Sequence, residues 1–159
     1  MTSGILLPLL LLAPVLVCAA LSDLRHMRIP NVLSLAGLAL FALCLPLIGL
    51  AELPLRIAAA GAVFAAGFAL FAVGLVGGGD VKLLSVLVLF VPPDVWALYA
   101  NLLAASLLAG VALVMAVQAI PNGAGSAWAV RRNRGSFPMG LSIALSGLTL
   151  PLAMALLAS

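Results

Sequence analysis

Charged residues are scarce in this 159-residue sequence. Lysine, arginine, aspartate and glutamate together account for 7% of the chain, and histidine occurs once. An ordinary soluble domain has about 25% charged residues, so the composition excludes a conventional water-soluble globule. Paired cysteines are absent as well. Cys18 and Cys44 lie inside apolar runs and form no CxxC motif, which predicts small hydrophobic side chains rather than a disulfide or a metal site.

Apolar residues make up most of the chain. They account for 66% of it, and the mean hydropathy is +1.38. At about 20 apolar residues per spanning helix, the length accommodates roughly six or seven spans and leaves no room for an extramembrane domain. The opening MTSG lacks the basic residues of a secretory signal, so we expect a retained first span. The composition therefore predicts an all-α membrane protein in which residues 1–159 form a single transmembrane domain.

Prolines, glycines and charges divide the chain into six apolar segments joined by short connections. The segments run approximately over residues 5–21, 32–50, 57–76, 81–91, 95–120 and 137–158. The fourth is short, because the 13 residues from Gly79 to Pro92 reach only about 20 Å as a helix, against about 30 Å of hydrocarbon. We expect the connection before it to dip below the membrane surface and to hold Asp80 at membrane depth.

The basic residues predict the orientation of this bundle of six transmembrane helices. Six of them fall in or directly beside the first, third and fifth connections, and the second connection holds only Arg56. The six are Arg25, Arg28, Lys82, Arg131, Arg132 and Arg134. Because cytoplasmic loops are enriched in lysine and arginine, these three connections are expected to be cytoplasmic and both termini outside. We therefore interpret the net charge of +3 as a topology signal and as contact with the lipid bilayer, not with nucleic acid.

The four acidic residues divide between the two sides. Glu52, four positions before Arg56, is expected to be an exposed loop charge, and Asp94 is expected to cap the fifth helix. Asp23 and Asp80 fall on the predicted cytoplasmic side, each at a helix end. A bundle can bring these two carboxyl groups together over a hydrated cavity.

Two carboxylates a few ångströms apart do not both ionise easily, so such a pair shares a proton near neutral pH and can do acid–base work. The alternative is that Asp23 pairs with Arg25 or Arg28, and Asp80 with Lys82, as ordinary interfacial charges. The segment 77–79 consists of three glycines, so a loop there can adopt positive φ and let a substrate strand approach its backbone; the alternative is a turn that ends the third helix.

The motifs around the two aspartates resemble those of the type IV prepilin peptidases, a family of GxGD membrane aspartyl proteases. Gly77, Gly78, Gly79 and Asp80 match the GxGD signature, and Lys82 follows at the position of the lysine in GxGDxK. Asp23 begins a DxxxxxIPN pattern that ends at residues 29–31. Residues 137–140, FPMG, resemble a segment that opens the last helix of the family.

This resemblance implies Asp23 and Asp80 as the catalytic pair, with Gly77, Gly78, Gly79 and Lys82 in the substrate-binding loop. It implies as substrates pilin-like precursors, in which a short basic leader ends in glycine before an apolar helix, cleaved at the cytoplasmic side of a bacterial inner membrane. It also implies the compact, peptidase-only form associated with Flp/Tad pili, because the paired CxxC motifs of the larger members are absent. No metal or cofactor is expected, and His26 is interpreted as an interfacial residue.

Two other functions remain open at this point. A small transport protein could use Asp23 and Asp80 to carry protons or cations, although we find no internal repeat. A presenilin-like protease would share the mechanism but act on other substrates. Neither the pilin cleaved nor the formation of a homo-oligomer follows from the sequence.

Overall fold

The computed structural model describes residues 3–119 and 139–157, and within these residues helices are the only regular secondary structure. The elements are α1 (Ser3–His26), α2 (Asn31–Ile48), α3 (Leu53–Ala72), α4 (Gly78–Phe90), the 3-10 helix η1 (Pro93–Val95), α5 (Trp96–Ala119) and α7 (Met139–Leu157). The predicted all-α fold is therefore confirmed.

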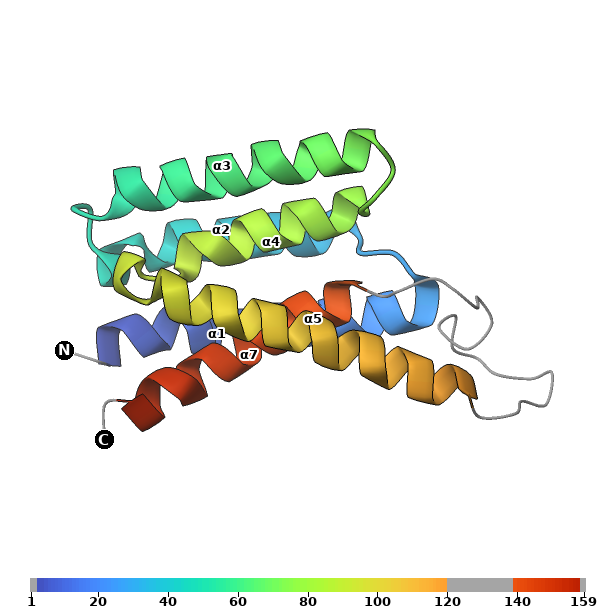
Figure 1. Cartoon of the computed structure of the whole chain (residues 1–159). Coiled ribbons are helices and arrows are strands. Elements are labelled where there is room, and N and C mark those ends of the chain that lie inside the picture. The colour runs from blue at the N-terminus through green and yellow to red at the C-terminus, as the bar shows by residue number, and fades with distance from the viewer. Residues whose placement is uncertain (1–2, 120–138, 158–159) are drawn as a thin grey trace.

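The helices run back and forth in one bundle with α4 at its centre (Figure 1). Helix α4 packs against α2, α3 and α7, while α1 packs against α2 and α7, and α5 against α7. The first residues of α1 and the last residues of α7 lie at the same end of the bundle (Figure 1). The connections after α1 and after α3 both lie at the opposite end, which we call the Asp80 end. The predicted alternation of these connections is thus confirmed, whereas the placement of both termini outside stays a prediction.

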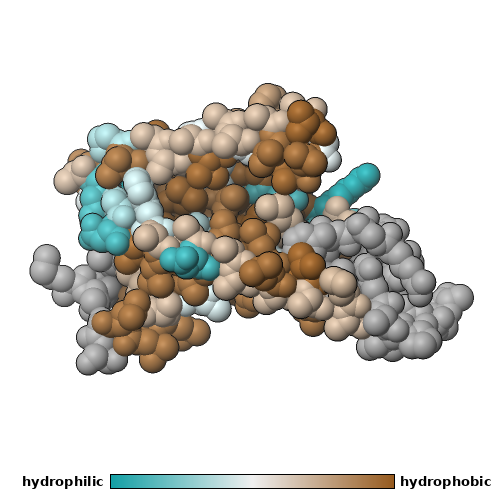
Figure 2. Space-filling model, in the orientation of Figure 1, coloured by the Kyte–Doolittle hydropathy of each residue, from teal (hydrophilic) through white to brown (hydrophobic). Residues whose placement is uncertain are grey.

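Within the described residues, five helices are long and apolar enough to cross a membrane: α1, α2, α3, α5 and α7. Figure 2 shows apolar residues across the middle of the visible face and hydrophilic residues mostly towards its ends. This is the arrangement of a multi-pass membrane protein. Helix α4 has only 13 residues and is the fourth segment that was predicted to be short. The helix is buried as well as short, since Leu83, Leu87 and Phe90 are almost completely enclosed by the neighbouring helices.

Several predicted boundaries are wrong. Helix α1 continues to His26, so Asp23 lies within its last turns rather than after it. Arg25 and His26 lie in the last turn of the helix, where a positive charge interacts favourably with the partial negative charge of the helix C-terminus. Helix α3 begins four residues before the predicted start, at Leu53, because proline is well suited to a first helical turn. Asp94 lies inside η1 and does not form the predicted cap hydrogen bond.

Glu52 lies in the connection before α3 with its side chain 44% exposed, which agrees with the predicted exposed loop charge, and it also forms an ion pair. Its carboxylate accepts hydrogen bonds at 2.8 and 3.2 Å from the guanidinium of Arg56, one helical turn later. The Arg56 side chain is only 3% exposed, and its Nη1 donates to the Leu89 carbonyl oxygen at 3.0 Å. Since the last carbonyl groups of a helix have no partner within that helix, this bond links the start of α3 to the end of α4.

We expect Arg56→Met to destabilise the protein by about 1–3 kcal/mol, because it leaves the Leu89 carbonyl buried without its donor. The measurement is thermal unfolding of the purified protein in detergent. Arg28→Met is the matched control, because the Arg28 side chain is exposed. Equal unfolding temperatures for the two variants would contradict a structural role for the buried guanidinium.

Candidate active site

Asp23 reaches the site from the last turns of α1. The residue is 4% exposed, and its carboxyl group faces the backbone N–H groups of Gly140 and Leu141 in the first turn of α7. These N–H groups belong to the unpaired donors of a helix N-terminus, where a carboxylate is well accommodated. One carboxyl oxygen, Oδ2, is buried without a hydrogen-bond partner among the described residues.

Asp80 lies in the first turn of the short central helix α4. Its side chain is partly buried and faces the backbone N–H groups at the start of that helix. Its Oδ1 atom is also buried and finds no partner in the described part of the chain. The two aspartates, 57 positions apart in the sequence, therefore each present an oxygen with unused hydrogen-bonding capacity.

The structure brings the two carboxyl groups close enough for their charges to interact. Ile29 lies between the segments that carry them. A Cβ added to Gly79 would lie 3.0 Å from the Ile29 carbonyl oxygen, and one added to Gly140 would lie 2.6 Å from Ile29 Cδ1 and 2.9 Å from Asp23 Oδ2. The segments around Asp23, Asp80 and Gly140 thus converge at the Asp80 end of the bundle (Figure 1).

The expectation that the Gly77–Gly79 segment forms a positive-φ loop is wrong. Gly77 is extended, with φ of −76°, and Gly78 and Gly79 belong to the first turn of α4. Among the glycines that the structure describes, positive φ angles occur at Gly49 and Gly74 instead. The three glycines serve close approach: a Cβ at Gly77 would lie 2.5 Å from Asp80 Oδ2, and one at Gly78 would lie 3.3 Å from the Phe71 ring. Without side chains there, the chain packs directly around Asp80.

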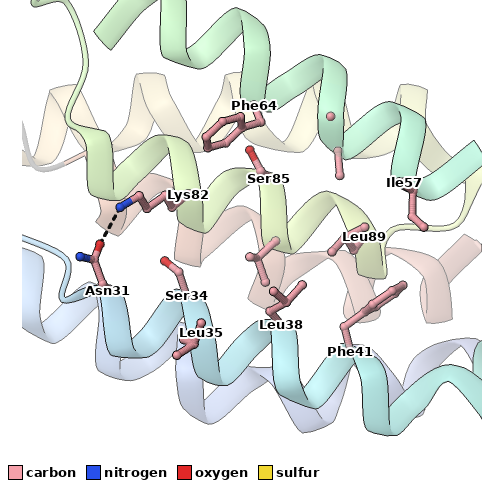
Figure 3. Close-up of a pocket in the computed structure, with 13 residues that line it drawn as sticks. Asn31, Ser34, Leu35, Leu38, Phe41, Ile57, Phe64, Lys82, Ser85 and Leu89 are labelled. Carbon is pink, nitrogen blue, oxygen red and sulfur yellow. Dashed lines mark hydrogen bonds between the residues drawn. The ribbon is translucent and has the colours of Figure 1, made fainter. Parts of the chain in front are cut away.

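Lys82 does not pair with Asp80. Its ammonium group donates to Oδ1 of Asn31 at 2.9 Å, which joins the start of α4 to the start of α2 (Figure 3). The alternative in which Asp80 is an ordinary interfacial partner of Lys82 is therefore wrong. Sequence reasoning noted the IPN and GxGDxK patterns separately, and their spacing contains no signal that Asn31 and Lys82 meet.

The other predicted residues contribute less to the site. His26 is exposed, and the described residues contain no group of three or more histidine, cysteine, aspartate or glutamate side chains that could hold a metal ion. Arg131, Arg132, Arg134 and the first half of the FPMG segment lie outside the described residues. Gly140, in the second half of that segment, contacts Asp23 directly.

Comparison with protein families decides the relationship that the motifs suggested. The model of the type IV leader peptidase family matches residues 10–115, which is more than half of the chain. The chain belongs to the type IV leader peptidase family. The matched region includes both Asp23 and Asp80. Neither the curated proteins nor the solved structures yield a match to the chain.

Membership of this leader peptidase family makes the chain a protease and confirms the resemblance drawn from the motifs. The family match ends before Gly140, so the contact that α7 makes with Asp23 is visible only in the tertiary structure. The position of Ile29 between two glycines likewise could not be predicted from the IPN motif, because the motif does not say which segments it contacts.

Proposed function

We propose that this leader peptidase is an aspartyl endopeptidase that removes the basic leader of Flp-like type IV prepilins at the cytoplasmic side of the membrane. The observation that carries the proposal is the pairing of Asp23 and Asp80, two carboxyl groups from different helices that interact and that each retain an unpartnered buried oxygen. Buried ionisable groups within membrane helices are costly and commonly functional.

The paired carboxyl groups suit the hydrolysis of a peptide bond. One ionised carboxylate accepts a proton from a water molecule as the water attacks the scissile carbonyl carbon, and the protonated partner polarises the carbonyl oxygen. The tetrahedral intermediate then collapses as the C–N bond breaks; the leaving nitrogen takes up the proton that the first carboxyl group accepted from water, and the carbonyl oxygen returns its proton to the partner. Ionisation belongs to the pair rather than to either residue. The unpartnered oxygens of Asp23 and Asp80 are the atoms we assign to the water and to the substrate carbonyl.

A groove between α3 and α5, with α4 as its floor, provides a route for the substrate helix. We call it the α3/α5 groove; it encloses about 370 Å³, and its walls include Ala59, Ala62, Leu84, Val88, Ala100 and Leu103. A smaller cavity of about 60 Å³ has Asp80 in its wall and shares Val63 and Leu84 with the groove. An apolar helix in the groove would therefore direct its end towards Asp80. The alanines favour such docking, because small residues let helices approach closely.

Filling this groove is expected to impair cleavage. Ala62→Trp places an indole ring where the substrate helix would lie, and we expect cleavage efficiency to fall about tenfold, mainly through a higher KM, because the substitution removes binding surface. The matched control is Ala65→Trp, at a residue that is exposed on the same helix and lines no described cavity. Equal impairment of the two variants would contradict this route.

The function itself is tested by co-expression with a prepilin-like precursor, scoring leader loss by gel mobility and by mass of the mature N-terminus. Cleavage after the leader glycine is expected for the wild type, and a precursor whose leader glycine is replaced by a bulky residue should remain uncut. A chelator should leave cleavage intact, because the proposed chemistry uses carboxyl groups alone. If the protein transports protons or cations and does not cleave the precursor, the proposal is wrong.

A further inference from the structure

A second groove lies on the other side of α3, and Asp80 is not among the residues that line it. We call it the α2/α3 groove; its apolar walls are Leu35, Leu38 and Phe41 on α2, Ile57 and Phe64 on α3, and Leu89 on α4. It encloses about 720 Å³, and Asn31 and Lys82 stand at one end of it (Figure 3). The groove is therefore long and apolar with a single cation at the Asp80 end.

The cation at this end has unused binding capacity. The Lys82 ammonium group is exposed and carries three N–H donors, of which one is used by Asn31. No acidic side chain in the described residues forms an ion pair with it, since the one salt bridge there joins Glu52 and Arg56. An anion at the Asp80 end would neutralise Lys82. This end is the predicted cytoplasmic side, where a membrane presents anionic phospholipid headgroups.

A second unsatisfied polar group lies one turn deeper. Ser34 lines the groove, is 7% exposed, and its hydroxyl group has no hydrogen-bond partner in the described part of the chain. Figure 3 shows this hydroxyl directed into the space between α2 and α4. Ser85 across the groove is satisfied, because it donates to the Val81 carbonyl oxygen at 2.8 Å. Ser34 therefore offers a free donor about 5 Å along α2 from Asn31.

We propose that the α2/α3 groove binds an anionic phospholipid. Its phosphate lies against Lys82, an ester carbonyl oxygen accepts a hydrogen bond from Ser34, and an acyl chain extends past Leu38 towards the far end of the groove. Along the groove, the Lys82 cation is followed by the Ser34 hydroxyl group and then by the apolar wall. A phospholipid has its phosphate, ester and acyl chain in the same order. A lipid held there would contact Lys82, two residues from Asp80, and would so support the start of α4.

A substrate helix fits this groove less well. Asp80 does not line it, so a peptide bound there would not be directed to the candidate catalytic pair. A basic leader would also meet the positive charge of Lys82. The lipid inference does not depend on the proposed peptidase function, because it rests on the groove alone.

Lipid retention by the purified protein tests the inference without an activity assay. The protein in a neutral detergent is titrated with phosphatidylglycerol or with phosphatidylcholine of the same acyl chains, and bound lipid is counted by native mass spectrometry. We expect about fivefold tighter retention of phosphatidylglycerol, the effect of one lysine near an anionic headgroup. Lys82→Gln should abolish the preference, Ser34→Ala should weaken retention of both lipids, and soluble glycerol phosphate should displace neither.

A matched pair on α2 tests the position of the acyl chain. Leu38→Trp fills the groove and should remove lipid retention, whereas Leu43→Trp, at a residue that is 77% exposed and outside the groove, should not. Both sites are exposed, so both variants are expected to unfold at the wild-type temperature. Equal retention of the two lipids, equal behaviour of the two tryptophan variants, or displacement of the lipid by a peptide of the precursor's apolar helix would overturn the inference.

Discussion

Asp80→Asn is expected to abolish leader cleavage, with a loss of about a thousandfold or more, as is typical when a general acid or base is removed. Asparagine has nearly the same shape as aspartate, so the packing of Gly77 against residue 80 is retained. Its amide can neither ionise nor give up a proton to the substrate. Cleavage is measured as the rate at which the precursor band is converted after induction, and with purified components as kcat/KM.

Three companion variants make this result interpretable. Asp23→Asn should cause a loss of the same size, and the double variant should lose little more, because residues that act as a unit are not additive. Asp94→Asn is the matched control, since Asp94 is exposed in η1. Each variant should unfold near the wild-type temperature. Substantial cleavage by either the Asp23 or the Asp80 variant would leave the carboxyl pair without a catalytic role.

Gly79→Ala is expected to reduce cleavage by about ten- to a hundredfold, because displacement of a reacting group by about 1 Å costs up to that much. The new Cβ would lie 3.0 Å from both the carbonyl oxygen and the Cβ of Ile29. A backbone oxygen cannot rotate away as a side chain can, so the start of α4 must shift and carry Asp80 with it. Helix propensity alone would make this substitution stabilising, because it favours alanine over glycine by about 1 kcal/mol. The steric clash with Ile29 acts in the opposite direction.

Gly61→Ala is the control for this prediction. Gly61 is also helical, in α3, but a Cβ there would meet nothing within 4 Å. Cleavage should be unchanged and thermal stability equal or slightly higher. Full activity of Gly79→Ala would mean that the contact with Ile29 does not position Asp80. Comparison of the two glycines thus separates close approach from a general effect of adding a methyl group.

The apolar segments between charged residues predicted the number and order of the helices better than the residues at which they begin and end. In the described part of the chain, the predicted apolar segments correspond to α1, α2, α3, α4, α5 and α7, and the short fourth segment matches α4 within a few residues. Boundaries were less predictable, because charge does not end a helix by itself. Asp23 and Arg56 were both predicted to lie outside helices, yet both lie within them. The N-terminus of α7 faces Asp23, and the Glu52 carboxylate and the Leu89 carbonyl oxygen accept hydrogen bonds from Arg56.

In the candidate site, too, the sequence identified the reacting residues but not the residues that contact them. Asp23 and Asp80 were identified from their motifs and their common side of the bundle. Their surroundings were not, since Gly140 contacts Asp23 from α7, and Ile29 contacts Gly79 and Gly140, through packing between segments that motif spacing does not relate. The glycines before Asp80 were recognised as important for the wrong reason, because composition does not distinguish a positive-φ turn from a helical turn against a neighbour.

The amino-acid sequence by itself determined that this chain is helical and membrane-like, that its basic residues gather in alternate connections, and that it carries the aspartate motifs of a leader peptidase. Hydropathy and motif spacing are local properties, so they can be seen without a fold. Only the tertiary structure decided that α1, α4 and α7 meet around the two carboxyl groups, and that α3 is flanked by two different grooves. Those features depend on which helix faces pack together, and several packings satisfy the same apolar pattern.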